Sequence, residues 1–415
     1  MILKKNNIFL ILFTSCNIFS LKGIILIFNM KICIVSDLHC KYRHLPTEKS
    51  ETFLISNSPR YPESRHPVAA FLNLIDKNKE ISADILVCPG DLGDKADEQG
   101  IISSWSFLQE IKVKLGAKFI VSVPGNHDIN SRKIQDKEPF EFIKYFHKDF
   151  PIIDESIRSK FWDQGFCFYV LDDVLFLLFN SVHNHTDPIK SNKSLILPEM
   201  LESIEETFNA NPAYGSVKHK IALFHHHPIQ HSNINNFVSS DVIDNGDVLI
   251  AKLNKLGFDL VIHGHKHQPR LVEYNGLPIF AAGSFSCFSN LQGTGINNMF
   301  HIVELKDENR KGIIYSWEYD IVNGWTQALN PNFPPKVGFG SNIDINVIAN
   351  DINKIFETNS RKAMLYDTVI EEIQDTEFLI PEKLIRLNEI LNNKFKIKVY
   401  PEYPLEPNKL AEYIY

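Results

Sequence analysis

Short apolar runs alternate with amphipathic stretches along most of the chain. Spacings of three or four residues between apolar positions, which are typical of helices, begin at Pro67 and return at 101–115, 198–210 and 247–256. Between these stretches, β-branched and apolar runs predict buried strands at the start of 31–40 and at 85–88, 118–123, 220–224 and 258–262. Two further runs predict a hairpin of 166–171 with 174–180, and we expect strands at 279–282, 299–305 and 312–319 to complete a second sheet.

The alternation of strands and helices predicts an α/β fold, more specifically an α+β sandwich of two packed mixed β-sheets flanked by helices. The stretch at 41–65 is polar and contains three prolines, so it predicts a long loop over the functional site and a candidate lid.

The pattern changes near residue 325. Pro331, Pro334 and Pro335 indicate a linker, and apolar residues recur at helical spacing from Ile345, with two more helical stretches at 361–373 and 381–392. We therefore expect three parts. These are residues 1–29 outside the fold, a main domain at 30–325, and a linker with a helical C-terminal appendage at 326–415.

Polar clusters follow five of the predicted strands. Asp37 and His39 are two residues apart at the end of the first strand, so their side chains point the same way. Ligands gather outside the carboxyl ends of strands in α/β sheets, so these clusters predict one shared site. The other four clusters are GDLGD at 90–94, GNHD at 125–128, HHHP at 225–228 and GHKH at 264–267, three of which contain a glycine that permits close backbone approach.

The residue types in these clusters favour a pair of divalent metal ions. Two ions about 3.5–4 Å apart need a ligand that bridges them, and a carboxylate can bridge whereas an imidazole cannot. Asp91 is therefore the natural bridge between an ion held by Asp37, His39 and a late histidine, and an ion held by Asn126 and further histidines. Mixed Asp, Asn and His ligands suit manganese, iron or zinc better than magnesium.

Taken in order, the motifs D-x-H, G-D-x-x-D, G-N-H-D, H-H-P and G-H-x-H resemble those of the calcineurin-like metallophosphoesterase superfamily. The resemblance spans Asp37 to His267 and implies a phosphoester hydrolase that uses a metal-bridging water as nucleophile. It also implies that His127 donates a proton to the leaving oxygen and that Asp94 orients His127. The implied ligands are Asp37, His39, Asp91 and His267 for one ion, and Asp91, Asn126, His226 and His265 for the other.

The HHHP cluster has one histidine more than the usual H-H-P of that family. Counting back from Pro228 selects His226, whereas counting from the end of the strand selects His225, and we prefer His226. The isolated histidines are expected to be structural, namely His183, His185, His219, His231 and His263.

The predicted reaction, phosphoester hydrolysis, does not identify the substrate. We favour a phosphodiesterase of small substrates such as cyclic nucleotides, with a phosphomonoesterase acting on a protein or a small molecule as the alternative. A nuclease ranks third. A different class of function is a non-catalytic scaffold whose metal site stabilises the fold and whose helical tail binds a protein partner. His127 and Asp94 argue against this scaffold, because a structural metal site has no use for a proton donor.

The composition and the net charge of the chain exclude some classes of binding partner. Apolar residues make up 44% of the 415-residue chain and charged residues 22%, which is ordinary for a soluble globular protein. The net charge of −7 argues against general nucleic-acid binding and against a membrane surface as partner. Six cysteines form no CxxC pair, so we expect reduced thiols rather than a disulfide framework.

The first 29 residues carry three lysines, no acidic residue and two apolar runs, each shorter than the roughly 20 residues that span a membrane. The sequence FTSC at 13–16 resembles a bacterial lipoprotein cleavage box, but an apolar run rather than a polar tether follows Cys16. We therefore favour an upstream segment before Met30 and a cytoplasmic protein. The alternative is a genuine signal on a lipid-anchored or exported protein.

Overall fold

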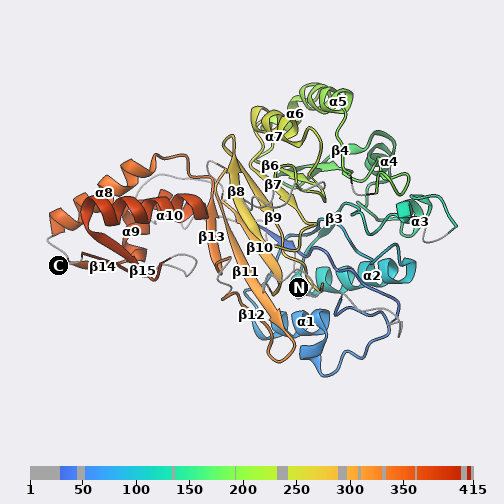
Figure 1. The fold of residues 1–415 in the computed structure, drawn as a ribbon, viewed down its shortest axis with the longest axis horizontal. Coiled ribbons are helices and arrows are strands. Elements are labelled where there is room, and N and C mark those ends of the chain that lie inside the picture. The colour runs from blue at the N-terminus through green and yellow to red at the C-terminus, as the bar shows by residue number, and fades with distance from the viewer. Residues whose placement is uncertain are drawn as a thin grey trace, which may run out of the picture.

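Two β-sheets packed face to face form the centre of the molecule (Figure 1). The structure, a computed structural model, describes residues 29–43, 52–132, 136–191, 193–230, 242–287, 297–306, 310–329, 333–359, 362–402 and 409–412. The predicted segment before the fold lies outside these residues, except for Asn29, and so does the middle of the predicted lid at 44–51.

The first sheet has the strand order β12-β11-β10-β1-β2-β3, and β13 also pairs with β11. Strand β1 lies in its middle, parallel to β2 and antiparallel to β10. The sheet is therefore mixed, as predicted. Its strands are β1 (Met30–Ile34), β2 (Ile85–Cys88), β3 (Phe119–Ser122), β10 (Asn298–Leu305), β11 (Gly312–Asp320), β12 (Gly324–Gln327) and β13 (Lys336–Phe339).

The second sheet has the order β4-β5-β6-β7-β9-β8, with parallel pairs from β5 through β6 and β7 to β9. Strands β4 and β5 form the predicted hairpin. The strands are β4 (Phe166–Leu171), β5 (Val174–Phe179), β6 (His219–Leu223), β7 (Leu260–His263), β8 (Arg270–Tyr274) and β9 (Leu277–Ala281).

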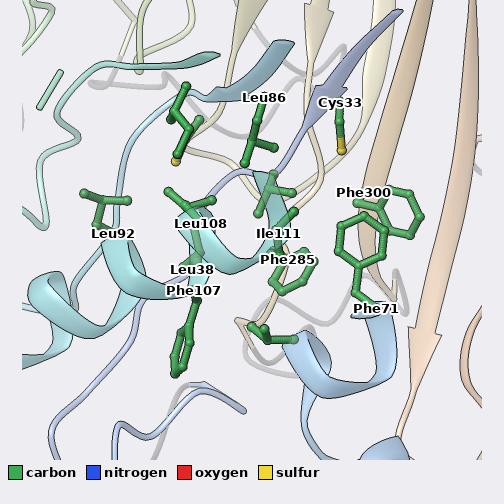
Figure 2. Packing of buried hydrophobic residues seen from close by; sticks show 14 of the residues in the cluster. Cys33, Leu38, Phe71, Leu86, Leu92, Phe107, Leu108, Ile111, Phe285 and Phe300 are labelled. Atoms are coloured by element: carbon green, nitrogen blue, oxygen red, sulfur yellow. The ribbon is translucent and has the colours of Figure 1, made fainter. Parts of the chain in front are cut away.

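Alternation along β1 shows how the layers are built. Ile32 and Ile34 face the second sheet and pack in the core between the two sheets. Cys33 points to the opposite face of the first sheet, which is covered by α1 (Pro67–Lys77) and α2 (Glu98–Leu115) (Figure 2). Helices α5 (Pro198–Asn209) and α7 (Gly246–Lys255) cover the outer face of the second sheet in the same way. The α/β sandwich predicted from the sequence is thus confirmed, with helices on both outer faces.

The helices begin and end where local chemistry favours it. For α2, the Asp97 side chain accepts a hydrogen bond from the Gly100 amide, and Gly116 ends the helix in the left-handed conformation at φ 75°. The helices of the main domain are η1 (Glu63–Arg65), α1 (Pro67–Lys77), α2 (Glu98–Leu115), η2 (Asn130–Arg132), α3 (Glu141–Tyr145), α4 (Glu155–Gln164), α5 (Pro198–Asn209), α6 (Pro212–Ser216) and α7 (Gly246–Lys255).

The late strands correct one prediction. The runs at 279–282, 299–305 and 312–319 do not share a sheet, because β9 joins the second sheet beside β7 while β10 and β11 join the first sheet beside β1. All three runs are mostly apolar and largely buried, and burial alone does not specify which sheet a strand enters.

The C-terminal part also differs from the expected linker and purely helical appendage. Strand β13 lies in the expected linker, pairs with β11 and so extends the first sheet. Beyond it, three strands form a small sheet that the helical periodicity of the neighbouring stretches concealed, and helices pack on it around a separate core (Figure 1). The elements are α8 (Ile345–Asn359), β14 (Ala363–Leu365), α9 (Tyr366–Glu372), η4 (Gln374–Phe378), α10 (Pro381–Ile390), η5 (Leu391–Phe395), β15 (Ile397–Tyr400) and β16 (Lys409–Glu412).

The contact between β13 and η4 gives a stability prediction. A Cβ atom on Gly338 would lie 1.9 Å from the Glu377 carbonyl oxygen, which is main chain and has little room to move. We expect Gly338→Ala to lower the free energy of unfolding by about 1–3 kcal/mol in chemical denaturation, because the C-terminal unit must shift away from the sheet. Gly215→Ala is the control, since its Cβ would meet no described atom within 4 Å. Equal stability of the two variants would contradict this packing.

Candidate metal centre

The five polar clusters meet at one edge of the sandwich, beyond the carboxyl ends of β1, β2, β3, β6 and β7. Main-chain hydrogen bonds tie the loops together. The Asp37 amide donates to the Gly90 carbonyl at 3.1 Å, and the His39 amide donates to the Asp91 carbonyl at 3.0 Å. The prediction that sequence-distant clusters share one site therefore agrees with the geometry.

The backbone at this edge is held in an unusual conformation. Five predicted site residues have positive φ angles in the left-handed region, which non-glycine residues seldom adopt: Asp37 (53°), His39 (46°), Asp91 (54°), His265 (81°) and His267 (57°). Such strain persists only where the surrounding structure imposes it, and it concentrates at functional sites.

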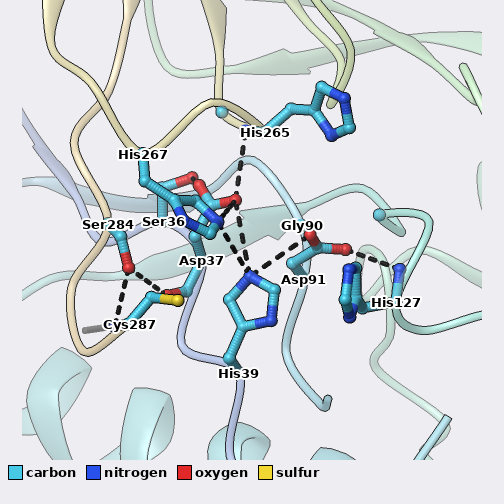
Figure 3. A network of polar contacts seen from close by, with 12 residues as sticks. Ser36, Asp37, His39, Gly90, Asp91, His127, His265, His267, Ser284 and Cys287 are labelled. Atoms are coloured by element: carbon cyan, nitrogen blue, oxygen red, sulfur yellow. Dashed lines mark hydrogen bonds and ion pairs between the residues drawn. The ribbon is translucent and has the colours of Figure 1, made fainter. Parts of the chain in front are cut away.

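A first group of ligand atoms comes from Asp37, His39, Asp91 and His267, all within 4.8 Å of one another (Figure 3). The Nε2 atoms of His39 and His267 are 3.0 Å apart. His39 Nε2 lies 3.4 Å from Asp91 Oδ2, and His267 Nε2 lies 3.5 Å from Asp37 Oδ1. These are the four residues predicted for one metal ion, and the structure brings them together.

A second group comprises Asp91, His225 and His265, and Asn126 lies against it. His225 Nε2 is 3.2 Å from Asp91 Oδ2 and 3.2 Å from Asn126 Oδ1. On the other side of the ring, Nδ1 is 3.0 Å from the Pro89 carbonyl oxygen, to which it can only donate. In the neutral ring this hydrogen bond leaves the Nε2 lone pair directed at the site, which is the tautomer that a metal ligand requires.

The structure therefore places His225, rather than the predicted His226, with the second group of ligand atoms. His226 is buried, but its Nδ1 lies 3.0 Å from the Ser181 hydroxyl and its ring belongs to neither group of ligand atoms. Strand β6 ends at Leu223, and the chain reaches the site two residues later. Counting from the end of the strand thus selects the histidine that lies in the second group, whereas counting back from Pro228 does not.

Asp94 and His127 lie beside the first group. His127 Nδ1 is 2.9 Å from Asp94 Oδ1, and the His127 amide donates to Asp91 Oδ1 at 2.8 Å. The His127 side chain is 22% exposed, whereas that of Asp94 is 1% exposed. The imidazole therefore has one nitrogen fixed by a buried carboxylate and the rest of its ring accessible from outside.

Electrostatics favour cations at this site. Burial raises the pKa of a carboxyl group, yet the surrounding histidines hold the pKa of both Asp37 and Asp91 below its ordinary value. Burial likewise lowers the pKa of an imidazole, yet Asp91 raises the pKa of His225 to about 9 and Asp37 raises that of His267. The two shifts are reciprocal, because each arises from attraction between the buried carboxylates and the imidazoles around them.

The donor set fits a pair of divalent ions. Asp91 is fully buried, and its Oδ2 accepts no hydrogen bond from the described residues, although it lies between the rings of His39 and His225. Burial lowers the pKa of His265 well below its ordinary value, which keeps this ring neutral as a ligand must be. A buried carboxylate oxygen between two sets of nitrogen and oxygen donors is what a bridging ligand requires.

The glycines of the motifs have the role expected of them at two positions. A Cβ on Gly125 would lie 2.1 Å from Asp91 Oδ1, and one on Gly264 would lie 2.5 Å from Asp37 Oδ2. Any side chain at these positions would displace a predicted ligand.

The isolated histidines lie outside both groups of ligand atoms in the part of the chain that the structure describes. His183 and His185 approach main-chain carbonyl oxygens at 2.9 and 3.1 Å, and His263 Nδ1 is 3.1 Å from the Gly264 carbonyl oxygen. His219 Nδ1 lies 3.8 Å from Asp259. His231 is outside the described residues.

Two side chains at the site escaped the sequence analysis. Lys41 is buried, and its Nζ lies 2.8 Å from Asp94 Oδ2. The sequence offered one indication of this role. Lys41 lies two residues after His39, so its side chain can point to the same side as that of His39. Cys287 lies within reach of His39 and His267, and no motif or spacing announces it.

The Lys41–Asp94 ion pair gives a second prediction. Lys41→Met keeps the apolar stem but leaves Asp94 buried with less compensating charge, so we expect about 3 kcal/mol lower stability in chemical denaturation. Lys118→Met, which breaks an exposed pair with Asp172, is the matched control and should leave the stability almost unchanged. A loss for Lys41→Met no greater than that of the control would show that the buried pair contributes little.

The sandwich brings two sets of Asp, Asn and His donors that could hold metal ions to the ends of its central strands, around one buried carboxylate. Comparison with family models shows the family to which this arrangement belongs. The calcineurin-like phosphoesterase model matches residues 30–269, more than half of the chain, and the chain belongs to that family.

The solved structures to which this chain is similar are remote in sequence. A dimetal phosphatase from zebrafish (Danio rerio) is 9% identical with a TM-score of 0.45, covering 72% of this chain and 98% of its own. A purple acid phosphatase from yellow lupin (Lupinus luteus) seeds is 15% identical with a TM-score of 0.44, covering 70% of this chain and 52% of its own. Vacuolar Protein Sorting 29 from Cryptosporidium parvum is 12% identical with a TM-score of 0.34, and the match covers 75% of this chain and 99% of that protein. A search of curated proteins finds no match.

Among the residues that the structure describes, no helix has both the length and the apolar composition needed to cross a bilayer.

Proposed function

We propose that this protein is a phosphoester hydrolase that works with two divalent metal ions. The observation that carries the proposal is the buried Asp91 carboxylate between two groups of ligand atoms, next to the partly exposed His127. When bound, a metal pair supplies an activated water and stabilises the charge that develops on the phosphoryl oxygens.

The proposed ligands follow from the two groups. Asp37, His39, Asp91 and His267 would hold one ion, and Asp91, Asn126, His225 and His265 the other. Manganese, iron and zinc remain the metals that this donor set favours.

His127 is proposed to protonate the oxygen of the departing group. Its Nδ1 is held by Asp94 at 2.9 Å, so the Nε2 position faces the accessible side of the site. Asp94 suits this role because it stays ionised. Burial would raise the pKa of Asp94, but hydrogen bonds with His127 and His39 outweigh burial and hold the pKa well below its ordinary range. The Asp94 carboxylate therefore keeps the His127 imidazole oriented.

A small phosphodiester such as a cyclic nucleotide is the substrate class that we propose. Asp37 and Asp91 are fully buried, and the side chain of His267 is only 19% exposed. A small ester can therefore enter this site more easily than a folded macromolecule can. The net charge of −7 also disfavours a polyanionic nucleic acid.

A protein-binding scaffold is the competing function, and one observation favours it. The C-terminal unit exposes the apolar side chains Val347, Leu365 and Ile385, at 49%, 63% and 43%. A partner that covers them would make this unit a docking module.

An ester panel tests the proposal. Purified full-length protein with manganese would be assayed against bis(p-nitrophenyl) phosphate, cyclic nucleotides, p-nitrophenyl phosphate and a phosphopeptide. We expect diesters to be hydrolysed faster than monoesters. Preference for the monoesters would replace the substrate class with that of a phosphomonoesterase. No turnover of any ester by protein that holds two ions per chain would refute the enzyme and favour the scaffold.

A further inference from the structure

Cys287 brings a sulfur atom to the first group of ligand atoms. Its Sγ and the ring nitrogens of His39 and His267 all lie within 4.8 Å of one another, so a single ion could contact all three. The same two histidines belong to the group formed with Asp37 and Asp91. In Figure 3 the sulfur is directed toward this group, from the chain segment that follows β9.

The backbone holds this cysteine firmly in place. The Cys287 amide donates to the Ser284 hydroxyl at 2.9 Å, and that hydroxyl in turn donates to the Asp37 carbonyl at 2.8 Å. From the other side, Asn298 Nδ2 donates a hydrogen bond to the Cys287 carbonyl at 2.5 Å. The main chain of Thr52 also pairs with that of Cys287 in an isolated antiparallel β-bridge. Cys287 is therefore fixed to the same loop that carries the first ligand, and its side chain is only 7% exposed.

A second observation points to a ligand at this position. The fully buried Asp91 Oδ2 accepts no hydrogen bond from the residues that the structure describes, and it faces His39 Nε2 at 3.4 Å. His39 and His267 therefore lie next to both the Cys287 sulfur and Asp91 Oδ2, an oxygen that can still accept a bond.

We propose that Cys287 is an additional ligand of the ion held by Asp37, His39, Asp91 and His267. The proposal rests on the dinuclear site proposed above and adds one bond to it, between the metal and the cysteine sulfur. The thiol loses its proton to solvent when this bond forms. No electron transfer is involved.

A sulfur ligand makes the two metal positions chemically different. Thiolate is a soft donor that favours zinc and iron over manganese and magnesium, whereas the other position offers only nitrogen and oxygen donors from Asp91, Asn126, His225 and His265. We therefore infer that the Cys287 position selects zinc or iron and that the other position is less selective.

Cobalt substitution tests the ligand directly. Metal-free full-length protein would be loaded with Co²⁺ alone, and its absorption spectrum recorded. We expect a thiolate-to-cobalt charge-transfer band in the near ultraviolet that Cys287→Ser removes and Cys167→Ser retains, because Cys167 is buried in β4 and outside both groups. Cys287→Ser should also weaken Zn²⁺ binding, because a hydroxyl is a poorer ligand for zinc than a thiolate.

A measurement on the unaltered protein covers the case in which Cys287→Ser does not fold. X-ray absorption of the Zn²⁺-loaded chain should show a sulfur neighbour at about 2.3 Å. Two bound ions with no charge-transfer band and no sulfur neighbour would overturn the Cys287 ligand while leaving the dinuclear site intact. Failure to bind two ions at all would overturn both proposals.

Discussion

Asp91→Asn is expected to reduce metal binding from two ions per chain to one or fewer and to lower phosphoester hydrolysis by about 10³-fold, the equivalent of about 4 kcal/mol. The substitution preserves the shape of the side chain but removes the charge between His39 and His225, whose Nε2 atoms lie 3.4 and 3.2 Å from Asp91 Oδ2. Two cations about 4 Å apart repel strongly, and a neutral amide compensates little of that repulsion. Elemental analysis of the dialysed variant gives the metal content.

Asp259→Asn is the matched control. Asp259 is also a buried aspartate, but it accepts a hydrogen bond from the Lys220 amide and pairs with Arg310, away from the site. This variant should retain both ions and its activity. An Asp91→Asn protein that binds two ions and hydrolyses esters at the normal rate would refute the bridging role.

His127→Ala is expected to keep both ions and to lose activity in a manner that depends on the leaving group. A general acid typically contributes about 10²- to 10⁴-fold where a basic leaving oxygen must be protonated, and much less where the group departs readily as an anion. We therefore expect a loss of that size on alkyl or ribose esters and a far smaller loss on a nitrophenyl ester. Steady-state rates on both substrates, with a metal count on the same sample, test this.

His225→Ala and His265→Ala are the comparison variants, since both rings lie in the second group of ligand atoms. These variants should bind less metal and lose activity on both substrates alike. If His127→Ala lost both activities equally, or lost metal, His127 would belong with the ligands rather than act as a proton donor.

The placement of the site was predictable because strand ends determine it. The polar clusters follow apolar runs that form β1, β2, β3, β6 and β7, and parallel strands bring such ends to one edge. The Asp37 and His39 pair was accessible to the same reasoning, since residues two apart at the end of a strand leave on one side.

The choice between His225 and His226 depends on information that residue order lacks. Adjacent residues project to different sides, so a shift of one position sends the neighbouring ring to the Ser181 hydroxyl instead of the site. The choice between these two histidines depends on the residue at which β6 ends, and the ends of strands are the least certain feature of a sequence-based prediction.

Cys287 and β13 could not be predicted for a related reason. Cys287 reaches the site because Ser284 ties its segment to the Asp37 carbonyl, a contact across about 250 residues of sequence. Strand β13 (Lys336–Phe339) is short and follows two prolines, so local signals indicate a linker, and its pairing with β11 supplies the structure. Long-range contacts decide both cases.

The most direct test of the central claim is a metal titration of the full-length protein during turnover. Metal-free protein would receive increasing amounts of Mn²⁺, with bound ions per chain and the rate of bis(p-nitrophenyl) phosphate hydrolysis measured on the same samples. We predict that binding ends at two ions per chain and that the rate rises chiefly as the second ion binds. Saturation at two ions without hydrolysis, or full hydrolysis by metal-free protein, would contradict a dinuclear phosphoesterase.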